Sequence, residues 1–340
     1  MTANVALLGY GLAGSMFHAP FISTTQGLRL SVIVTGNEER REQAVREHPG
    51  VEVVGTAGEV WERAAELDLA VIATPNNSHL PLGLAALEVG LAVVVDKPLA
   101  LNAEEGRALV DAAAERGLMV TALQNRRWDG DFLTVRKLLD TGELGRVHRF
   151  ESRFDRWRPE TGDGWRERTP AAKGGGLLLD LGSHLVDQAV QLFGPVSKLY
   201  AEVDARREGA VADDDVFLAL EHESGVYSHL WASVLAADPG PRFRVLGDRA
   251  AYVKHGLDVQ EGALRAGRSP AEPGFGEEPQ ERWGRLVTGE DRREVPTEPG
   301  SYSSFYAGVA ASLRDGAPPP VDPRDAVAVL EILDEARAAG

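Results

Sequence analysis

Hydrophobic residues in the first 125 positions fall into short continuous runs, and the segments between them have the periodicity of amphipathic helices. The runs predict strands at residues 4–8, 28–34, 51–54, 69–73, 91–95 and 118–123. The intervening segments predict helices at residues 15–23, 38–47, 57–67, 78–89 and 102–115. Apolar strands that alternate with such helices indicate a parallel sheet covered on both faces, the doubly wound α/β arrangement of a Rossmann fold.

The pattern changes after residue 125. Runs with partial alternation predict a mostly antiparallel, open sheet, at residues 146–155, 199–205, 216–222, 226–235 and 243–246. Further helices are expected at residues 131–139, 180–193, 304–314 and 323–339. Residues 266–300 are rich in Pro, Gly and Glu and are expected to form a long surface excursion. We therefore expect two domains, a Rossmann domain at residues 1–125 and an α+β domain at residues 126–340.

Charge and composition exclude several classes of function. The chain has 340 residues and a formal net charge of −16, which argues against nucleic acid or an anionic membrane as its main partner. It contains no cysteine, so it has no disulfide, thiolate metal site or cysteine nucleophile. No apolar run approaches the roughly 18 residues of a membrane span, and the first residues do not resemble a signal peptide. We expect a cytoplasmic protein.

A glycine-rich turn follows the first predicted strand and precedes the first helix. Gly9, Gly11 and Gly14 form the pattern G-x-G-x-x-G, with Leu12 and Ala13 between the last two glycines. In this context the three glycines allow a tight turn, close approach of a pyrophosphate and close packing of helix on strand. The N-terminus of the helix would then face the phosphates. The alternative is an ordinary glycine-rich loop.

The end of the second predicted strand bears on the choice of cofactor. NAD-binding domains usually place Asp or Glu there to hold the ribose hydroxyls, but this chain has Thr35, followed by Asn37. Arg40 and Arg41 come one helical turn later and could bind a 2′-phosphate. We therefore expect NADP(H), with NAD(H) possible. In the alternative interpretation, both arginines are surface cations paired with neighbouring glutamates.

A lysine follows the fifth predicted strand, in the sequence Asp96-Lys97-Pro98. The carboxyl end of that strand is where a nicotinamide would lie, and lysine is rare in this chain. Lys97 could therefore stabilise negative charge on a substrate oxygen during hydride transfer. The alternative is a solvated loop lysine.

A polar stripe is expected on the helix that follows three consecutive glycines. Asp180, His184 and Asp187 are spaced at i, i+4 and i+7, and a histidine is well suited to proton transfer near neutral pH. A carboxylate one turn away could orient that histidine. The alternatives are a solvated polar face or a metal site, and no further ligands with recognisable spacing support the metal.

Taken in order, these motifs resemble the Gfo/Idh/MocA oxidoreductase family, in which the lysine motif is usually Glu-Lys-Pro. The resemblance covers essentially the whole chain. Residues 17–20 (Phe-His-Ala-Pro), 124–129 and 154–159 are similar to the branch that contains NADP-dependent scyllo-inositol dehydrogenases.

The resemblance implies specific roles. Lys97, Asp180 and His184 would be catalytic, with His184 as the proton donor or acceptor. Residues at the strand ends would complete the cofactor site: Thr74, Pro75, Asn76, His79, Asp96, Pro98 and Asn125. The pocket wall over a polyol would draw on Arg126, Trp128, Arg156, Trp157 and Trp165. The second domain would bind the substrate and form dimers or tetramers through its sheet.

These observations predict an NADP(H)-dependent dehydrogenase that acts on a secondary alcohol or ketone of a sugar, inositol or related polyol, without a metal. One alternative is a cofactor-binding sensor or regulator with no turnover, because a fold does not fix a function. Another is a relative that uses NAD for transient oxidation during glycoside hydrolysis.

Overall fold

The computed structural model describes residues 2–162 and 164–339, and the chain divides into two compact units. The first unit contains Met1–Asn125, Ala263–Phe275 and Tyr302–Ala328. The second contains Arg126–Gly262, Gly276–Ser301 and Val329–Gly340. This division is more complex than a single boundary at residue 125, because two late segments return to the first unit.

Aromatic packing and a backbone contact attach these late segments to the first unit. The ring of Phe21 lies 6.2 Å from the rings of Phe275 and Tyr302. Thr121 donates a hydrogen bond to the carbonyl oxygen of Val321, at 2.8 Å. Contacts of this kind, between residues about 200 positions apart, leave no periodic signal in the sequence.

The sheet of the first unit confirms the predicted Rossmann fold. Its strand order is β3-β2-β1-β4-β5-β6 and every neighbouring pair is parallel, which is the order of dinucleotide-binding folds. The strands are β1 (Ala3–Leu8), β2 (Leu28–Val34), β3 (Glu52–Val54), β4 (Leu69–Ile72), β5 (Ala92–Asp96) and β6 (Val120–Leu123). β4 is buried along its whole length, as expected of a strand covered on both faces.

Helices in the first unit begin and end at recognisable signals. Asn37 caps α2 and Asn102 caps α5, each by accepting a hydrogen bond from a backbone N–H three residues later. Gly117, in a left-handed conformation, ends α5. The helices are α1 (Ala19–Thr24), α2 (Glu38–Glu47), α3 (Ala57–Trp61), α4 (His79–Glu88), α5 (Ala103–Arg116) and α10 (Ser303–Asp315). A π-helical turn, η1 (Gly14–His18), precedes α1.

The second unit is built on an open, mostly antiparallel sheet, as predicted. Its strand order is β14-β13-β12-β11-β7-β10-β9-β8, with β7 and β10 the parallel pair. The strands are β7 (Val147–Asp155), β8 (Val196–Asp204), β9 (Asp215–His222), β10 (Tyr227–Ser233), β11 (Phe243–Gly247), β12 (Ala251–Lys254), β13 (Gly284–Thr288) and β14 (Asp291–Val295). Along β9 and β10 buried residues alternate with more exposed ones, so one face of the sheet is covered and the other is open.

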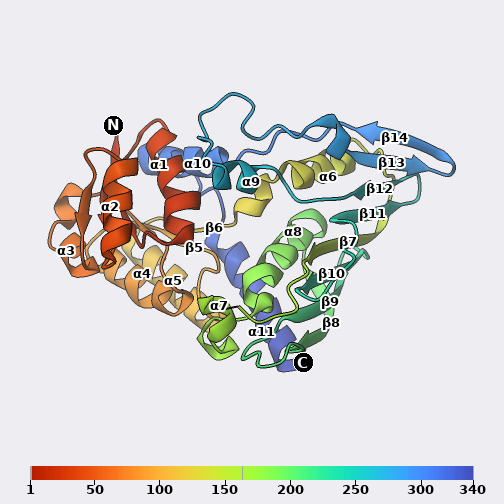
Figure 1. Ribbon diagram of the computed structural model, residues 1–340, viewed down its shortest axis with the longest axis horizontal. Helices are drawn as coiled ribbons and strands as arrows, with labels where there is room; N and C mark the ends of the chain where they lie inside the picture. The colour runs from red at the N-terminus through yellow and green to blue at the C-terminus, as the bar shows by residue number, and fades with distance from the viewer. Residues whose placement is uncertain (1, 163, 340) are drawn as a thin grey trace. The chain divides into compact units, whose positions relative to one another are not determined.

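Helix α8 (Ser183–Phe193) packs on the covered face, against β7 and β10 (Figure 1). A second π-helical turn, η6 (Leu178–Gly182), leads into it. The other helices of this part of the chain are α6 (Gly130–Asp140), α7 (Trp165–Arg168), α9 (Gln260–Arg265) and α11 (Pro323–Ala339). Both α9 and α11 cross from one unit to the other along the chain.

The predicted surface excursion at residues 266–300 contains a hairpin, β13–β14, that was not predicted from the sequence; most of its residues are exposed. Gly289 and Glu290 form a two-residue loop, and Gly289 has φ of 61°. A glycine with positive φ at the first loop position is typical of tight hairpins, and this signal was present in the sequence. The high content of Pro, Gly and Glu around the hairpin obscured it.

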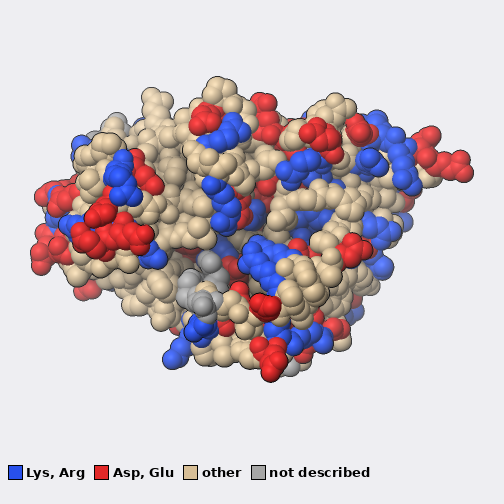
Figure 2. All heavy atoms as spheres, in the orientation of Figure 1, with Lys and Arg blue, Asp and Glu red and all other residues tan. Residues whose placement is uncertain are grey.

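Charged side chains are unevenly distributed on the face drawn in Figure 2. Acidic side chains gather over α2 and α3, and basic ones over β13 and β14. Within the described part of the chain, no helix combines the length and the apolar character that crossing a bilayer requires.

Candidate active site

The glycine turn of the first unit is closed on one side and open on the other. A Cβ atom on Gly9 would lie 2.5 Å from the carbonyl oxygen of Ala73, and one on Gly14 would lie 2.0 Å from that of Gly9. A Cβ on Gly11 would have only the guanidinium of Arg40 nearby, at 3.7 Å. Gly9 and Gly14 are therefore required by packing, whereas Gly11 leaves space where a backbone can approach a ligand. This cradle fits the pyrophosphate of a dinucleotide.

Residues between the glycines anchor the turn and expose one apolar side chain. Tyr10 is buried and its hydroxyl donates to Glu47 at the end of α2, at 2.6 Å. Leu12 is 49% exposed at the tip of the turn. The helix then begins with the π-helical turn η1, in which the N–H of Ala19 donates to the carbonyl oxygen of Gly14. Single π-helical turns occur frequently at functional sites.

The end of β2 contains no carboxylate in the position that holds ribose hydroxyls. Thr35 is buried there and accepts a hydrogen bond from the N–H of Asn37, whose own side chain caps α2. The two arginines that follow have different surroundings. Arg40 lies beside Gly11, whereas Arg41 turns away and donates to the carbonyl oxygen of Val53, at 2.6 Å.

At the ends of β4 and β5, the predicted nicotinamide residues are held by a buried histidine. The two ring nitrogens of His79 lie 2.9 Å from the carbonyl oxygen of Thr74 and 2.8 Å from that of Pro98. His79 thereby joins the two loops that contain Pro75, Asn76 and Lys97. Burial lowers the pKa of His79, and the charge of Asp96 opposes that shift. Asn76 and Asn125 are also buried in this unit.

Asp96 is joined to a second buried histidine that motif reasoning did not place in the site. Nε2 of His18 lies 3.5 Å from an oxygen of Asp96, and Nδ1 lies 2.6 Å from the hydroxyl of Tyr306. Burial by itself would raise the pKa of Asp96, but the hydrogen bond and charge of His18, aided by Lys97 and His79, hold the pKa below its usual range. No sequence signal pointed to Tyr306, which lies 288 residues from His18.

The polar stripe expected on the second-unit helix is not a solvated face. His184 and Asp187 are buried, and the π-helical turn η6, which contains Asp180, changes the spacing that an ordinary α-helix would give. Nε and Nη2 of Arg127 donate hydrogen bonds to the carboxylate of Asp187, the shortest of them at 2.9 and 2.6 Å. It therefore forms a buried ion pair with Arg127. The ring of Phe154 lies 6.4 Å from that of His184.

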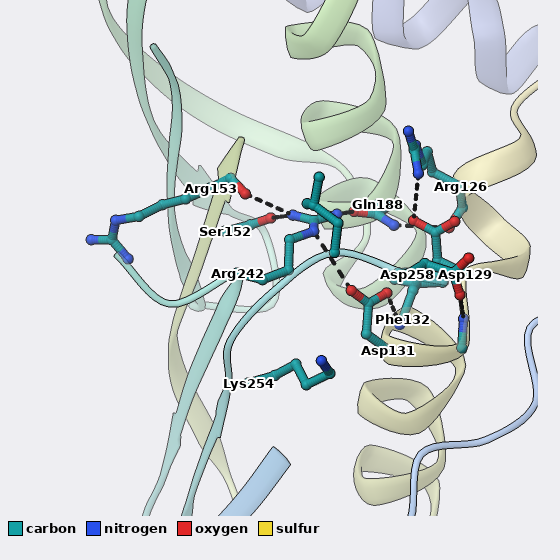
Figure 3. A network of polar contacts seen from close by, with 12 residues as sticks. Arg126, Asp129, Asp131, Phe132, Ser152, Arg153, Gln188, Arg242, Lys254 and Asp258 are labelled. Atoms are coloured by element: carbon teal, nitrogen blue, oxygen red, sulfur yellow. Dashed lines mark hydrogen bonds and ion pairs between the residues drawn. The ribbon is translucent and has the colours of Figure 1, made fainter. Parts of the chain in front are cut away.

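A buried polar network fixes α8 one turn below His184. Figure 3 shows the guanidinium of Arg242 between Ser152, Gln188 and Asp131. It donates to Ser152 and, at 2.7 Å, to Gln188, and its Nε lies 3.8 Å from Asp131. Gln188 also donates to the carbonyl oxygen of Arg126, at 2.8 Å. The helix that positions His184 is thus tied to β7 and α6 by residues that have no sequence pattern in common.

The predicted substrate residues have different surroundings. Arg156 and Asp180 line one cavity. Arg126 is buried and pairs with Glu261 at 2.6 Å and Asp129 at 3.5 Å. Trp128 is partly buried and Trp157 is 56% exposed. The side chain of Trp165 lies outside the described residues.

All the predicted cofactor residues belong to the first unit, and Asp180, His184 and the described substrate candidates belong to the second. Within the described ranges, no three His, Cys, Asp or Glu side chains are grouped so that they could hold a metal ion.

A parallel sheet with this strand order and a glycine cradle after β1 defines a dinucleotide-binding protein. Residues 3–124 match the family model of the oxidoreductase family with an NAD-binding Rossmann fold, and residues 132–253 match that of the GFO/IDH/MocA C-terminal domain. The chain belongs to the Gfo/Idh/MocA family of oxidoreductases.

Individual relatives are similar over nearly their whole length. The chain is 37% identical to scyllo-inositol 2-dehydrogenase (NADP(+)) IolW of Bacillus subtilis, covering 98% of this chain and 93% of the relative. It is 38% identical to the oxidoreductase YdgJ of Escherichia coli, covering 97% and 94%. The solved structure of yvaA from Bacillus subtilis has a TM-score of 0.93 at 36% identity, covering 99% and 96%. The protein is therefore an NAD(P)-dependent dehydrogenase that acts on CH–OH groups.

Proposed function

We propose that this dehydrogenase uses NADP(H) and oxidises or reduces a secondary alcohol or ketone of a sugar, inositol or related polyol. The observation that carries the cofactor preference is the guanidinium of Arg40 beside Gly11, together with Thr35 at the position where a carboxylate would repel a 2′-phosphate. The similarity to a dehydrogenase of scyllo-inositol supports the substrate class.

The cofactor assignment is tested by fluorescence titration with NADPH and NADH. Arg40→Gln would remove the proposed charge-assisted contact with the 2′-phosphate. NADPH binding should then weaken by roughly 10- to 100-fold, with little effect on NADH binding. Arg41→Gln is the matched control, because Arg41 donates to Val53 and should leave the ratio of the two affinities unchanged. Tighter binding of NADH by the unmodified protein would contradict the preference.

In the proposed reaction, three side chains act on the reacting oxygen of the substrate. His184 gives or takes its proton, Lys97 stabilises the negative charge that develops on it, and Asp180 orients the substrate. When bound, the nicotinamide supplies or accepts the hydride. The burial of His184 and the network around Gln188 support this assignment, because a proton-transfer group must be held in a fixed orientation.

His184→Ala tests the chemistry. Loss of a general acid–base group should lower kcat by roughly 10²- to 10⁴-fold, while the Kd of NADPH stays within about twofold. His255→Gln, which changes an exposed histidine of the same unit, is the control. Unchanged turnover in His184→Ala would remove His184 from the mechanism. Cofactor binding without turnover on any polyol by the unmodified protein would instead favour a sensor.

We also propose a cytoplasmic homodimer or homotetramer that assembles through the open face of the second-unit sheet. Aromatic side chains gather on that face: the ring of Phe217 lies 5.1 Å from that of Trp231 and 6.4 Å from that of Tyr200. Tyr200 is 58% exposed. Exposed aromatic clusters are typical of interfaces. Light scattering should report a dimer or tetramer that dissociates in Phe217→Glu; a monomer at all concentrations would contradict assembly.

A further inference from the structure

A small cavity in the second unit is lined, among the described residues, by three arginines and three acids. Its volume is about 220 Å³, and its charged lining residues are Arg156, Arg158, Arg207, Glu167, Asp180 and Asp213. Pockets for drug-sized ligands measure roughly 300–1,000 Å³, so this one suits a smaller molecule. Because Asp180 is part of its wall, the cavity lies at the proposed site of reaction.

Arg207 pairs with carboxylates of the protein and supports the neighbouring backbone. It donates to Asp214 at 2.9 Å and to Glu167 at 3.1 Å, and both carboxylates belong to this unit. Its guanidinium also donates to the carbonyl oxygens of Arg158 and Glu160, at 3.3 and 3.0 Å. Arg207 thus fixes the backbone that contains Arg158 and uses its own charge in doing so.

Arg156 differs from the buried arginines of the unit. Arg126, Arg127, Arg207 and Arg242 each have a carboxylate within 4 Å. Among the residues that the structure describes, no carboxylate lies within ion-pair distance of Arg156. Its side chain is nevertheless partly buried, and that burial lowers its pKa, although the more distant charges of Asp180 and Glu261 oppose the shift. A partly buried cation without a direct ion pair would be stabilised by a ligand that supplies the opposite charge.

The backbone holds Arg156 and Arg158 at fixed positions beside β10. The N–H of Arg156 donates to the carbonyl oxygen of Ser233 at 2.8 Å, and that of Arg158 to Val234 at 2.7 Å. Two residues apart on an extended segment, they place side chains on the same side of the chain. The structure records no carboxylate partner for the Arg158 side chain among the described residues either.

The acidic residues that line the cavity have contacts of their own. Asp213 accepts a hydrogen bond from the N–H of Leu178 at 2.5 Å, so its charge is used to hold the π-helical turn η6. Asp180 also lines the cavity, and the proposed function assigns it to the hydroxyls of the substrate. The cavity therefore has a hydroxyl-binding end at Asp180 and a cationic end at Arg156 and Arg158.

We propose that the substrate is an anionic polyol, a sugar or polyol that carries a carboxylate or phosphate, with this oxyanion bound by Arg156 and Arg158. This inference rests on the proposed function and narrows its substrate class. A neutral polyol would leave Arg156 with only the more distant charges of Asp180 and Glu261, whereas an oxyanion would form direct charge-assisted hydrogen bonds with it. Carboxylate and phosphate share this chemistry, so the experiment must distinguish them.

The test compares gluconate and glucose 6-phosphate with glucose and scyllo-inositol as substrates of the unmodified protein. At least one of the two anions should have a kcat/KM roughly 10- to 100-fold above that of the neutral compounds, and the better anion identifies the group. In Arg156→Gln the KM for that anion should rise by a similar factor, and by clearly more than the KM for glucose rises. Arg156→Lys should restore part of the loss because it keeps the charge.

Arg249→Gln, which removes an exposed guanidinium from the turn between β11 and β12, is the matched control and should behave like the unmodified protein. Preference for the neutral compounds, or an equal effect of Arg156→Gln on neutral and anionic substrates, would overturn the inference.

A binding measurement separates this inference from the proposed function. If no compound is turned over, the proposed function fails, but gluconate and glucose 6-phosphate can still be titrated calorimetrically. Binding by the unmodified protein that Arg156→Gln weakens would support the anion site without catalysis. Absence of binding by either anion would overturn it.

Discussion

The two π-helical turns of this protein, η1 in the first unit and η6 in the second, are held by different forces. At η1 the constraint is local: Gly14 lies against Gly9, five residues earlier, so closely that no side chain fits. At η6 the constraint is distant in sequence: Asp213 accepts the N–H of Leu178 across 35 residues. Both turns contain candidate site residues, Gly14 in η1 and Asp180 in η6, in keeping with the frequent occurrence of such turns at functional sites.

The helices that follow also differ in their contacts. Beyond η1, the ring of Phe21 in α1 packs against Phe275 and Tyr302. Beyond η6, α8 depends on the buried network in which Arg242 binds Gln188 across 54 residues. The glycine cradle depends on the absence of side chains at Gly9 and Gly14. It therefore tolerates few substitutions there, but it needs no hydrogen-bonding side chains from elsewhere. A helix held by polar side chains can be displaced by changing any one of several distant residues. The comparison therefore predicts which substitutions should disrupt the glycine turn of the first unit and which should disrupt α8 of the second.

The largest loss of stability should come from Arg242→Met. This substitution leaves Asp131 buried without its cation, and breaking a buried pair in this way costs about 3–5 kcal/mol. Urea denaturation should report that decrease in the free energy of unfolding. Arg244→Met is the matched control: Arg244 is largely exposed and its partner Glu151 keeps a second partner in Arg153, so the loss should be about 0–1 kcal/mol.

The double variant Arg242→Met, Asp131→Leu sharpens this prediction. With both charges removed, most of the lost stability should return, because replacing a buried pair with apolar groups is often nearly neutral. If Arg242→Met alone changed stability no more than Arg244→Met, the network would not be what holds α8.

A smaller loss is expected from Gly14→Ala. The added Cβ would lie 2.0 Å from the carbonyl oxygen of Gly9, so the backbone must shift, at a cost of about 1–3 kcal/mol. The same shift should abolish NADPH binding, which fluorescence titration measures directly. Gly262→Ala is the control, since nothing lies within 4 Å of its Cβ position in α9 and alanine there should stabilise by roughly 0.5–1 kcal/mol. Normal NADPH affinity in Gly14→Ala would show that the cradle is not a steric requirement.

The same contrast explains how much of the molecule could be predicted from its sequence. Strand β2 and helices α2 and α11 begin and end at the predicted residues, because the sequence signals that fix their ends are local. The hairpin β13–β14 was missed although its turn was visible. Tyr306 and the Arg242 network had no visible signal, because hydrogen bonds between distant residues impose no periodicity.

The candidate site residues follow the same pattern: those fixed by local sequence could be predicted, and those fixed by distant contacts could not. The glycines and Lys97 come directly after predicted strands, so their location was available from the sequence. The structural role of Asp187 was not, because its partner Arg127 is 60 residues away. That Arg156 has no direct ion pair among the described residues could not be predicted either, since it depends on which carboxylates the other arginines bind.

The smallest expected effect is the dependence of stability on pH, and the two units should differ in it. The guanidinium of Arg242 keeps its charge at any ordinary pH, so its network should not respond to mild acid. His79 in the first unit should respond. Burial lowers its pKa, so below about pH 6.5 the unfolded chain takes up a proton that the folded chain does not. Stability should therefore fall as the pH falls, by at most about 1.4 kcal/mol per pH unit from this group.

Urea denaturation at pH 7.5, 6.5 and 5.5 should then show a shallower dependence in His79→Gln than in the unmodified protein, with His255→Gln as an exposed control. The opposite result is equally informative. Both ring nitrogens of His79 face carbonyl oxygens, which only accept hydrogen bonds, and a neutral ring can donate to one of them only. If His79→Gln removed stability chiefly at low pH, the ring would be an imidazolium that joins the two cofactor loops. The charge near Lys97 would then be set by histidines, as the charge near Asp180 is set by arginines.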